Sequence, residues 1–281
     1  MSPGDWAAML EEIVTLACEA SDVVAAAYAR ADMHVDYKSP GDPVTDADRE
    51  ANALLVDRLG ARFPDAALVG EESVEAARGD RARADLAIFV DPLDGTRDFV
   101  DRTGEFAVMI GIAERGVAAL GVVLEPASGR GFAAAPGTPA FGFRRTSPRD
   151  RTPIRVRERA RPDGGRMLLS RTRARPETIA LAERLGMETT RTGSAGVKGA
   201  RVATGEADAY VHLGTAGYLW DVAAVDAIVH GAGGRFTDQQ GEPFDYRRPS
   251  YENDRGVVCA SPLVHAAIMA ALRATPTGGA A

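Results

Sequence analysis

Cysteine is scarce in this chain. The 281 residues include only Cys18 and Cys259, which lie far apart in the sequence. Two distant cysteines in a chain of this length are typical of reduced, buried thiols rather than of a disulfide framework. The chain also lacks any apolar run that approaches the length of a membrane span. We therefore expect neither a fold stabilised by disulfide bonds nor a helical membrane protein.

A basic leader is missing as well. The first residues carry Asp5, Glu11 and Glu12 and no basic region ahead of an apolar stretch. Because secretory signal peptides need both features, we expect none here and assign the protein to the cytoplasm.

Positive charge is in deficit, with a formal net charge of −7. This balance argues against a general binder of nucleic-acid polymers or of anionic membranes. It does not exclude a small anionic substrate, because bound cations can invert the local field. Apolar residues make up 45% of the chain, which is enough for a sizeable core. The length predicts one large domain or two closely packed ones.

Hydrophobic periodicity in the first half predicts two helices followed by a mostly antiparallel sheet. A loop is expected over Lys38–Pro43, where two prolines and a glycine occur, and Thr45 is expected to cap the second helix. The predicted helices cover 6–17 and 46–59, and the predicted strands cover 86–90, 107–112, 119–124 and a hairpin within 132–143.

The second half alternates between strands and helices, which favours layered α/β packing. The tail from Thr275 to Ala281 is predicted to be disordered. Strands are expected at 167–169, 209–211 and 257–260, and helices at 177–185, 197–204, 222–229 and 264–272.

Between the halves, residues 144–166 hold nine arginines together with proline and glycine. Such a segment can be an anion-binding patch or a solvated connection, and charged runs more often lie on the surface. Its sequence does not decide between the two.

The strand expected over 86–90 leads into the most informative segment. Asp91 and Asp94 follow it directly, and Gly95 permits a tight turn that folds both carboxylates toward one place, with the Leu93 carbonyl between them. Carboxylate and carbonyl oxygens are hard ligands that suit Mg²⁺. A helix that starts after Gly95 would favour a bound phosphate. An Asx turn or a helix cap explains the pair of aspartates equally well.

Two further segments add carboxylates. Gly70–Ser73 follows the apolar run 66–69, and Asp221 stands at a predicted helix start, where a simple N-cap is the alternative. Because burial of three or four carboxylates together is prohibitive without cations, the combination predicts a metal centre.

Together these segments resemble the inositol monophosphatase superfamily of lithium-sensitive, magnesium-dependent phosphatases, over roughly 11–260. The resemblance implies the layered αβαβα sandwich of the inositol monophosphatase/fructose-1,6-bisphosphatase type. It also implies an N-terminal α+β half over 1–145 with most metal ligands, and a C-terminal α/β half over 146–281 with Asp221 and the substrate-binding segments. The matching motifs are Pro-Val-Thr-Asp-Ala-Asp at 43–48, Gly-Glu-Glu-Ser at 70–73, Asp-Pro-Leu-Asp-Gly-Thr at 91–96 and Trp-Asp-Val-Ala-Ala at 220–224.

The resemblance also assigns metal ligands. Glu71, Asp91 and the Leu93 carbonyl are implied to bind a first Mg²⁺. Asp91, Asp94 and Asp221 are implied to bind a second, with Asp91 bridging. A third, weaker ion is implied near Glu71.

Catalytic roles follow from the same resemblance. Thr96 and Asp48 are implied to orient and help deprotonate the attacking water, next to Glu71. One metal activates that water and the other stabilises the leaving alkoxide, in a two-metal in-line displacement. The four histidines show no spacing of metal ligands or nucleophiles, and no Cys-X5-Arg loop surrounds either cysteine. A histidine phosphatase is therefore not expected.

The resemblance implies a small phosphorylated metabolite as substrate, and three features resemble the 3'(2'),5'-bisphosphate nucleotidase branch. These are Gly-Glu-Phe at 104–106, Ser-Arg-Thr-Arg at 170–173 with Arg173 in place of a histidine, and Gly193–Lys198. His212 stands where inositol monophosphatases place a glutamate. The expected substrate-binding residues are Asp94, Gly95, Thr96, Gly193, Ser194, Lys198, His212 and Asp221.

Alternatives stay open at this stage. Lys198 can anchor a second phosphate or be a solvated helix residue, and Arg171 can belong to a basic surface. Glu105 can be an exposed charge, His212 a packed loop residue and Lys38 a surface lysine. Inositol-1-phosphate or a broader range of sugar and nucleoside phosphates is the alternative substrate. A non-catalytic scaffold is the alternative of another class, and homodimerisation is not decided.

Overall fold

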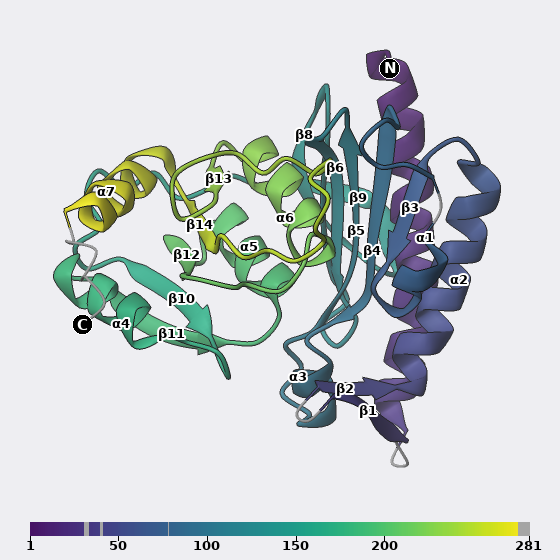
Figure 1. Cartoon of the computed structure of the whole chain (residues 1–281), viewed down its shortest axis with the longest axis horizontal. Coiled ribbons are helices and arrows are strands. Elements are labelled where there is room, and N and C mark those ends of the chain that lie inside the picture. Colours follow the sequence, from purple (N-terminus) through teal and green to yellow (C-terminus); the bar gives the residue numbers. More distant parts are fainter. Residues whose placement is uncertain (31–33, 40–41, 78, 275–281) are drawn as a thin grey trace.

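The computed structural model describes residues 1–274 apart from 31–33, 40–41 and 78. The tail that the sequence predicts to be disordered lies outside these residues. Five layers follow one another across the molecule: a helix pair, a seven-stranded sheet, a second helix pair, a five-stranded sheet and a third helix pair (Figure 1). The predicted αβαβα sandwich is confirmed.

The larger sheet is antiparallel except for its first pair of strands, which is parallel. Its strands are adjacent in chain order, and the second strand, β4, carries the two aspartates singled out above at its C-terminal end. The strands are β3 (Ala67–Gly70), β4 (Leu86–Asp94), β5 (Ala107–Glu114), β6 (Val117–Glu125), β7 (Arg130–Ala135), β8 (Thr138–Arg144) and β9 (Ser147–Pro153).

Helices α1 (Pro3–Ala29) and α2 (Asp46–Arg62) cover the outer face of this sheet (Figure 1). In α2, Ala47, Ala51, Leu55 and Leu59 repeat every four residues and are all buried, so they form one apolar stripe facing the strands. The helix begins directly after Thr45, as predicted.

The smaller sheet mixes parallel and antiparallel pairs in the order β11-β10-β12-β14-β13. Helices α5 (Ala195–Ala203) and α6 (Trp220–Gly231) lie between the two sheets, and α4 (Pro176–Arg184) and α7 (Pro262–Arg273) cover the far face (Figure 1). The strands are β10 (Arg166–Ser170), β11 (Glu188–Thr192), β12 (Ala209–His212), β13 (Arg235–Thr237) and β14 (Val257–Ala260).

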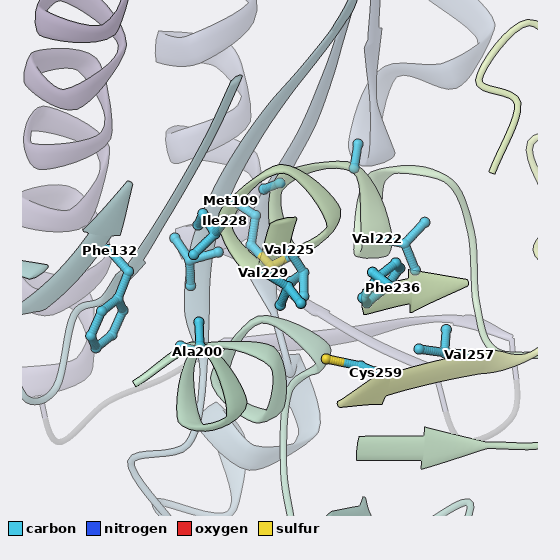
Figure 2. Packing of buried hydrophobic residues seen from close by; sticks show 14 of the residues in the cluster. Met109, Phe132, Ala200, Val222, Val225, Ile228, Val229, Phe236, Val257 and Cys259 are labelled. Atoms are coloured by element: carbon cyan, nitrogen blue, oxygen red, sulfur yellow. The ribbon is translucent and has the colours of Figure 1, made fainter. Parts of the chain in front are cut away.

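The middle layer holds the sheets together through a shared apolar core. Figure 2 shows Met109 of the larger sheet packed near Val225 and Ile228 of α6, with Phe236 and Cys259 of the smaller sheet on the other side. All are at most 1% exposed. Because these residues come from both sheets, the position of one sheet relative to the other is fixed by packing.

Two expectations about loops need correction. The segment 38–43 is not a plain loop, because its ends belong to β1 (Val35–Ser39) and β2 (Asp42–Thr45), which pair antiparallel. Proline is tolerated on such edge strands, so Pro43 does not prevent pairing.

The arginine-rich segment 144–166 contains β9, the edge strand of the larger sheet, and is therefore not only a connection. Arg145 pairs with Asp22 and Arg151 with Glu11, both on α1. Charged side chains on an edge strand discourage pairing with other chains. Because β9 follows residue 145, the larger sheet extends past the expected boundary, and the division at 145/146 stays a prediction.

Glycine lets α6 approach the larger sheet closely. A Cβ on Gly121 would lie 2.1 Å from the Ala224 carbonyl oxygen, whereas one on Gly142 would find its nearest neighbour at 3.6 Å. We expect Gly121→Ala to lower the free energy of unfolding by about 3 kcal/mol, since overpacking against backbone cannot relax cheaply. Gly142→Ala is the matched control and should change it by less than about 1 kcal/mol. Chemical denaturation compares them, and equal values would contradict the close approach.

Candidate active site

The end of β4 forms the floor of the site. The Leu93 amide donates to Asp91 Oδ1 at 3.0 Å, so the chain turns back immediately after Asp91. Gly95 has φ +94°, and a Cβ there would lie 3.1 Å from the Glu105 carbonyl oxygen and 3.2 Å from Ser194 Cβ. Both the positive φ and the close approach favour glycine. Helix α3 (Thr96–Val100) begins directly afterwards, as predicted.

Three carboxylates from three elements meet above this floor. Glu71 begins the 3-10 helix η1 (Glu71–Ala76), Asp91 comes from β4, and Asp221 lies in the first turn of α6. One ligand oxygen of each lies within 4.8 Å of the others. The sequence prediction that these residues converge is confirmed.

This cluster fits a divalent cation. Burial raises the pKa of Asp91 well above its usual value, and the charges of Glu71 and Asp94 raise it further. Burial likewise raises the pKa of Glu71 and of Asp221. Such shifts mean that the ionised carboxylates are poorly stabilised by the protein alone. Oxygen donors of this kind are the ligands that Mg²⁺ prefers.

One ammonium lies at the rim of the cluster. Lys38 Nζ donates to Glu71 Oε1 at 2.9 Å and to Glu72 Oε1 at 2.5 Å. Lys38 is therefore not a free surface lysine. It partly offsets the negative charge of the cluster on the side of Glu71.

Asp94 connects the two halves of the site. Its Oδ2 accepts hydrogen bonds from the Ser194 hydroxyl and from the Gly196 amide at 2.7 Å. Ser194 is the N-cap residue of α5, and its hydroxyl also accepts from the Val197 amide at 3.0 Å. Asp94 thus holds the start of α5 against the end of β4.

Asp48 and Thr96 form the expected pair. The Thr96 hydroxyl donates to Asp48 Oδ1 at 2.9 Å, and Asp48 Oδ2 accepts from the Thr45 hydroxyl at 2.6 Å and the Thr45 amide at 2.7 Å. Burial raises the pKa of Asp48 to about 6, although the hydrogen bonds from Thr45 and Thr96 lower it. A carboxyl with this pKa can act as a general base near neutral pH.

Apart from Lys38 and Asp48, the predicted site residues described above line one cleft of ≈ 610 Å³. Asp48 lies behind Thr96 and does not line it. The expected site residues in the lining are Glu71, Asp91, Leu93, Asp94, Gly95, Thr96, Gly193, Ser194, Lys198, His212 and Asp221.

An ion-pair network supports the loop before α5. Arg171 Nε donates to Asp98 Oδ1 at 2.9 Å, and its guanidinium also pairs with Glu105. Glu105 Oε2 accepts from the Gly193 amide at 2.7 Å. Arg171 and Glu105 therefore pair with each other. Arg171 is not simply part of a basic surface, and Glu105 is not a lone exposed charge. The sequence did not indicate a role for Asp98, because no local pattern connects it to Arg171, which lies 73 positions later in the chain.

Two expected substrate ligands are buried. Lys198 is 4% exposed, and burial lowers its pKa to about 8. His212 is 6% exposed, its Nε2 lies 2.9 Å from the Thr215 carbonyl oxygen, and burial lowers its pKa to about 4. His212 is therefore neutral at pH 7. The solvated-helix interpretation of Lys198 is wrong.

Two tyrosines of the cleft were not predicted. Tyr218 is 46% exposed and stacks on Trp220, with ring centroids 4.6 Å apart. Tyr210 lies under the Lys198 ammonium, at 5.0 Å. Isolated tyrosines carry no spacing signal, although the proximity of Tyr218 to the Trp-Asp motif could have drawn attention to it.

A family model described as the inositol monophosphatase family matches residues 5–277. The chain belongs to the inositol monophosphatase family. The family is magnesium-dependent in general, and membership makes this chain a phosphatase that acts on a phosphorylated small molecule.

Individual relatives agree with this assignment. The chain is 34% identical over 250 residues to 3'(2'),5'-bisphosphate nucleotidase CysQ of Escherichia coli K12, covering 87% of this chain and 97% of the relative. It is 33% identical over 261 residues to human inositol monophosphatase 1, covering 89% and 91%.

Among solved structures, extragenic suppressor protein suhB of Bartonella henselae superposes with a TM-score of 0.81 at 25% identity, covering 95% of this chain and 99% of that one. Thermotoga maritima IMPase superposes with a TM-score of 0.77 at 27% identity, covering 94% and 96%. None of the helices in the described part of the chain has the length and apolar character needed to cross a bilayer.

Proposed function

We propose that this phosphatase is a magnesium-dependent 3'(2'),5'-bisphosphate nucleotidase that removes the 3'-phosphate of adenosine 3',5'-bisphosphate. The observation that carries the proposal is the charge pattern of the cleft. Its carboxylates gather around Asp91, and Arg171, Arg173 and Lys198 line the same cavity. A substrate with two phosphates can place one at the carboxylate cluster and the other near a cation.

We assign the metal centre to the same residues as the sequence did. Glu71, Asp91 and the Leu93 carbonyl would hold one Mg²⁺, Asp91, Asp94 and Asp221 would hold another, and a weaker third ion would lie near Glu71. When bound, magnesium supplies Lewis acidity that polarises the phosphoryl oxygens and neutralises the charge developing on the departing oxygen.

The protein's own groups position the nucleophile. Because the Thr96 hydroxyl donates to Asp48, its oxygen can accept a hydrogen bond from a water in the cleft. Asp48 then receives a proton through Thr96, which raises the nucleophilicity of that water. No side chain needs to be phosphorylated in this scheme. The Gly95 and Thr96 amides, with Gly193, Ser194 and His212 across the cleft, are assigned to the substrate.

The test is phosphate release with Mg²⁺ from adenosine 3',5'-bisphosphate, inositol 1-phosphate, fructose 1,6-bisphosphate and AMP. We expect the highest kcat/KM for the bisphosphate nucleotide. The chain is 33% identical to human inositol monophosphatase 1, close to its 34% identity to the nucleotidase, so inositol 1-phosphate is the second candidate substrate. A higher kcat/KM for inositol 1-phosphate would overturn the nucleotidase assignment and leave the metal centre intact.

A further inference from the structure

One buried arginine lies outside the lining of the cleft. Arg81, in the segment between η1 and β4, is 8% exposed. Within the described residues no acidic side chain pairs with it, and its Nε and Nη1 make no hydrogen bond. A buried charge without a carboxylate partner costs free energy. The stability of the fold therefore does not explain why an arginine stands here.

The side chain of Arg81 reaches a segment far along the chain. Its guanidinium donates to the carbonyl oxygen of Arg248 and, at 3.0 Å, to that of Pro249. It also lies over the ring of Tyr251, with Cζ 4.0 Å from the ring centroid. Such a cation–π contact is strongest where water is excluded. Arg81 therefore ties the segment 248–251 to the segment that precedes β4.

The segment that Arg81 holds supports the loop before α6. The Tyr251 carbonyl oxygen accepts a hydrogen bond from the Leu219 amide at 2.8 Å. The Asn253 amide donates to the Gly217 carbonyl oxygen, also at 2.8 Å. Because both bonds join backbone to backbone, the loop 216–219 follows the position of the segment that Arg81 holds.

The same loop places the carboxylate of Asp221. The Tyr218 amide donates to Asp221 Oδ2 at 2.9 Å. A Cβ on Gly217, where φ is +83°, would lie 1.8 Å from that oxygen. The backbone of the loop therefore lies directly against the carboxylate, and a shift of the loop would move this proposed metal ligand.

We propose that Arg81 is a positioning residue for the metal centre. Through the segment 248–253 it holds the loop 216–219, and with it Asp221, in the orientation that binds Mg²⁺. This inference rests on the proposed metal centre. Since Arg81 does not line the cleft, its effect reaches Asp221 through the backbone of the loop. Replacing a group that supports a metal ligand typically changes metal affinity by tenfold or more.

The experiment measures Mg²⁺ binding to metal-free protein by isothermal titration calorimetry, together with the melting temperature in the absence of metal. For Arg81→Met we expect the dissociation constant of the ion that Asp221 binds to rise roughly tenfold. The melting temperature should change by less than about 4 °C, because methionine removes a buried charge that no carboxylate balances. Arg81→Lys should recover part of the affinity, since an ammonium can also donate to the carbonyl oxygens and lie over the ring.

Arg159→Met is the matched control. Arg159 also donates to loop carbonyl oxygens, those of Asp163 at 2.9 Å and Gly164 at 3.3 Å, and it does not line the cleft. Unlike Arg81, it pairs with a buried carboxylate, because the Asp208 side chain is 1% exposed. Its replacement leaves that carboxylate unpaired, so the melting temperature should fall while the Mg²⁺ affinity stays unchanged.

Asp221→Asn supplies a second reference, because it removes the ligand itself. In that background Arg81→Met should have no further effect on Mg²⁺ binding. Tyr251→Leu removes the ring under the guanidinium and should weaken Mg²⁺ binding by a smaller factor, which keeps the test open if Arg81→Met does not fold.

The inference is overturned if the folded Arg81→Met or Tyr251→Leu protein binds Mg²⁺ as tightly as the wild type. It is also overturned if Arg159→Met weakens binding equally, or if Arg81→Met still weakens binding in the Asp221→Asn background. Wild-type protein that binds no Mg²⁺ is a distinguishable result, because it contradicts the metal centre itself and the inference with it.

Discussion

Asp91→Asn abolishes phosphatase activity in our account, with kcat/KM lower by roughly 10³ or more, since loss of a shared metal ligand removes several kcal/mol of charge stabilisation. The variant should nevertheless fold. Asn keeps a side-chain oxygen that can accept from the Leu93 amide. In the presence of a chelator it should melt at a higher temperature than the wild type.

The sign of the stability change follows from the pKa of Asp91. Burial and the neighbouring carboxylates raise that pKa in the folded protein, so the ionised form destabilises the fold at pH 7. A neutral amide removes this penalty. Added Mg²⁺ should raise the melting temperature of the wild type and much less that of the variant. Asp85→Asn is the control, because the Asp85 side chain is 80% exposed. An Asp91→Asn variant with near-wild-type activity would contradict the assigned centre.

Asp48→Asn is expected to lower kcat by roughly 10²–10⁴ while KM changes little. Asp48 lies behind Thr96 and does not line the cleft, so the substituted side chain does not contact the substrate. The measurement is steady-state phosphate release at saturating Mg²⁺. A large rise in KM with an unchanged kcat would contradict the role of a general base.

The pH profile tests the same residue independently. Because the base must be deprotonated and burial raises the pKa of Asp48 to about 6, wild-type kcat/KM should rise with pH through an acid limb at or below that value. Bound Mg²⁺ would move the limb to lower pH. Thr45→Val removes a hydrogen bond that lowers this pKa and should move the limb to higher pH. The limb should disappear in Asp48→Asn, and its persistence there would assign it to another group.

Local patterns predicted which carboxylates come together, because each stands near the end of a recognisable element; that they bind metal stays a prediction. Asp91 follows a fully apolar run within β4, Asp221 lies at the start of a helix and Glu71 follows a short apolar run. The main helices were predictable for the same reason. In α2 the buried residues repeat at helical spacing, and the helix begins where Thr45 predicts it.

Contacts between distant segments were not predictable in this way. Arg171 meets Asp98 and Glu105 only because α5 and the smaller sheet dock on the end of β4, and no periodicity encodes that docking. Lys198 was judged from its motif alone, although its burial depends on the packing of α5 against β12. Edge strands such as β9 carry charged residues in place of an apolar alternation, so they resemble solvated loops in the sequence.

Magnesium dependence tests the central claim most directly. Protein freed of metal by a chelator is assayed for phosphate release from adenosine 3',5'-bisphosphate and from inositol 1-phosphate while Mg²⁺ is added back. The account predicts no release without the ion, restored release as Mg²⁺ rises, and none at any Mg²⁺ concentration in Asp91→Asn. Release that is insensitive to chelation, or equal in Asp91→Asn and the wild type, would contradict the claim that the cluster of Glu71, Asp91 and Asp221 is the catalytic metal centre.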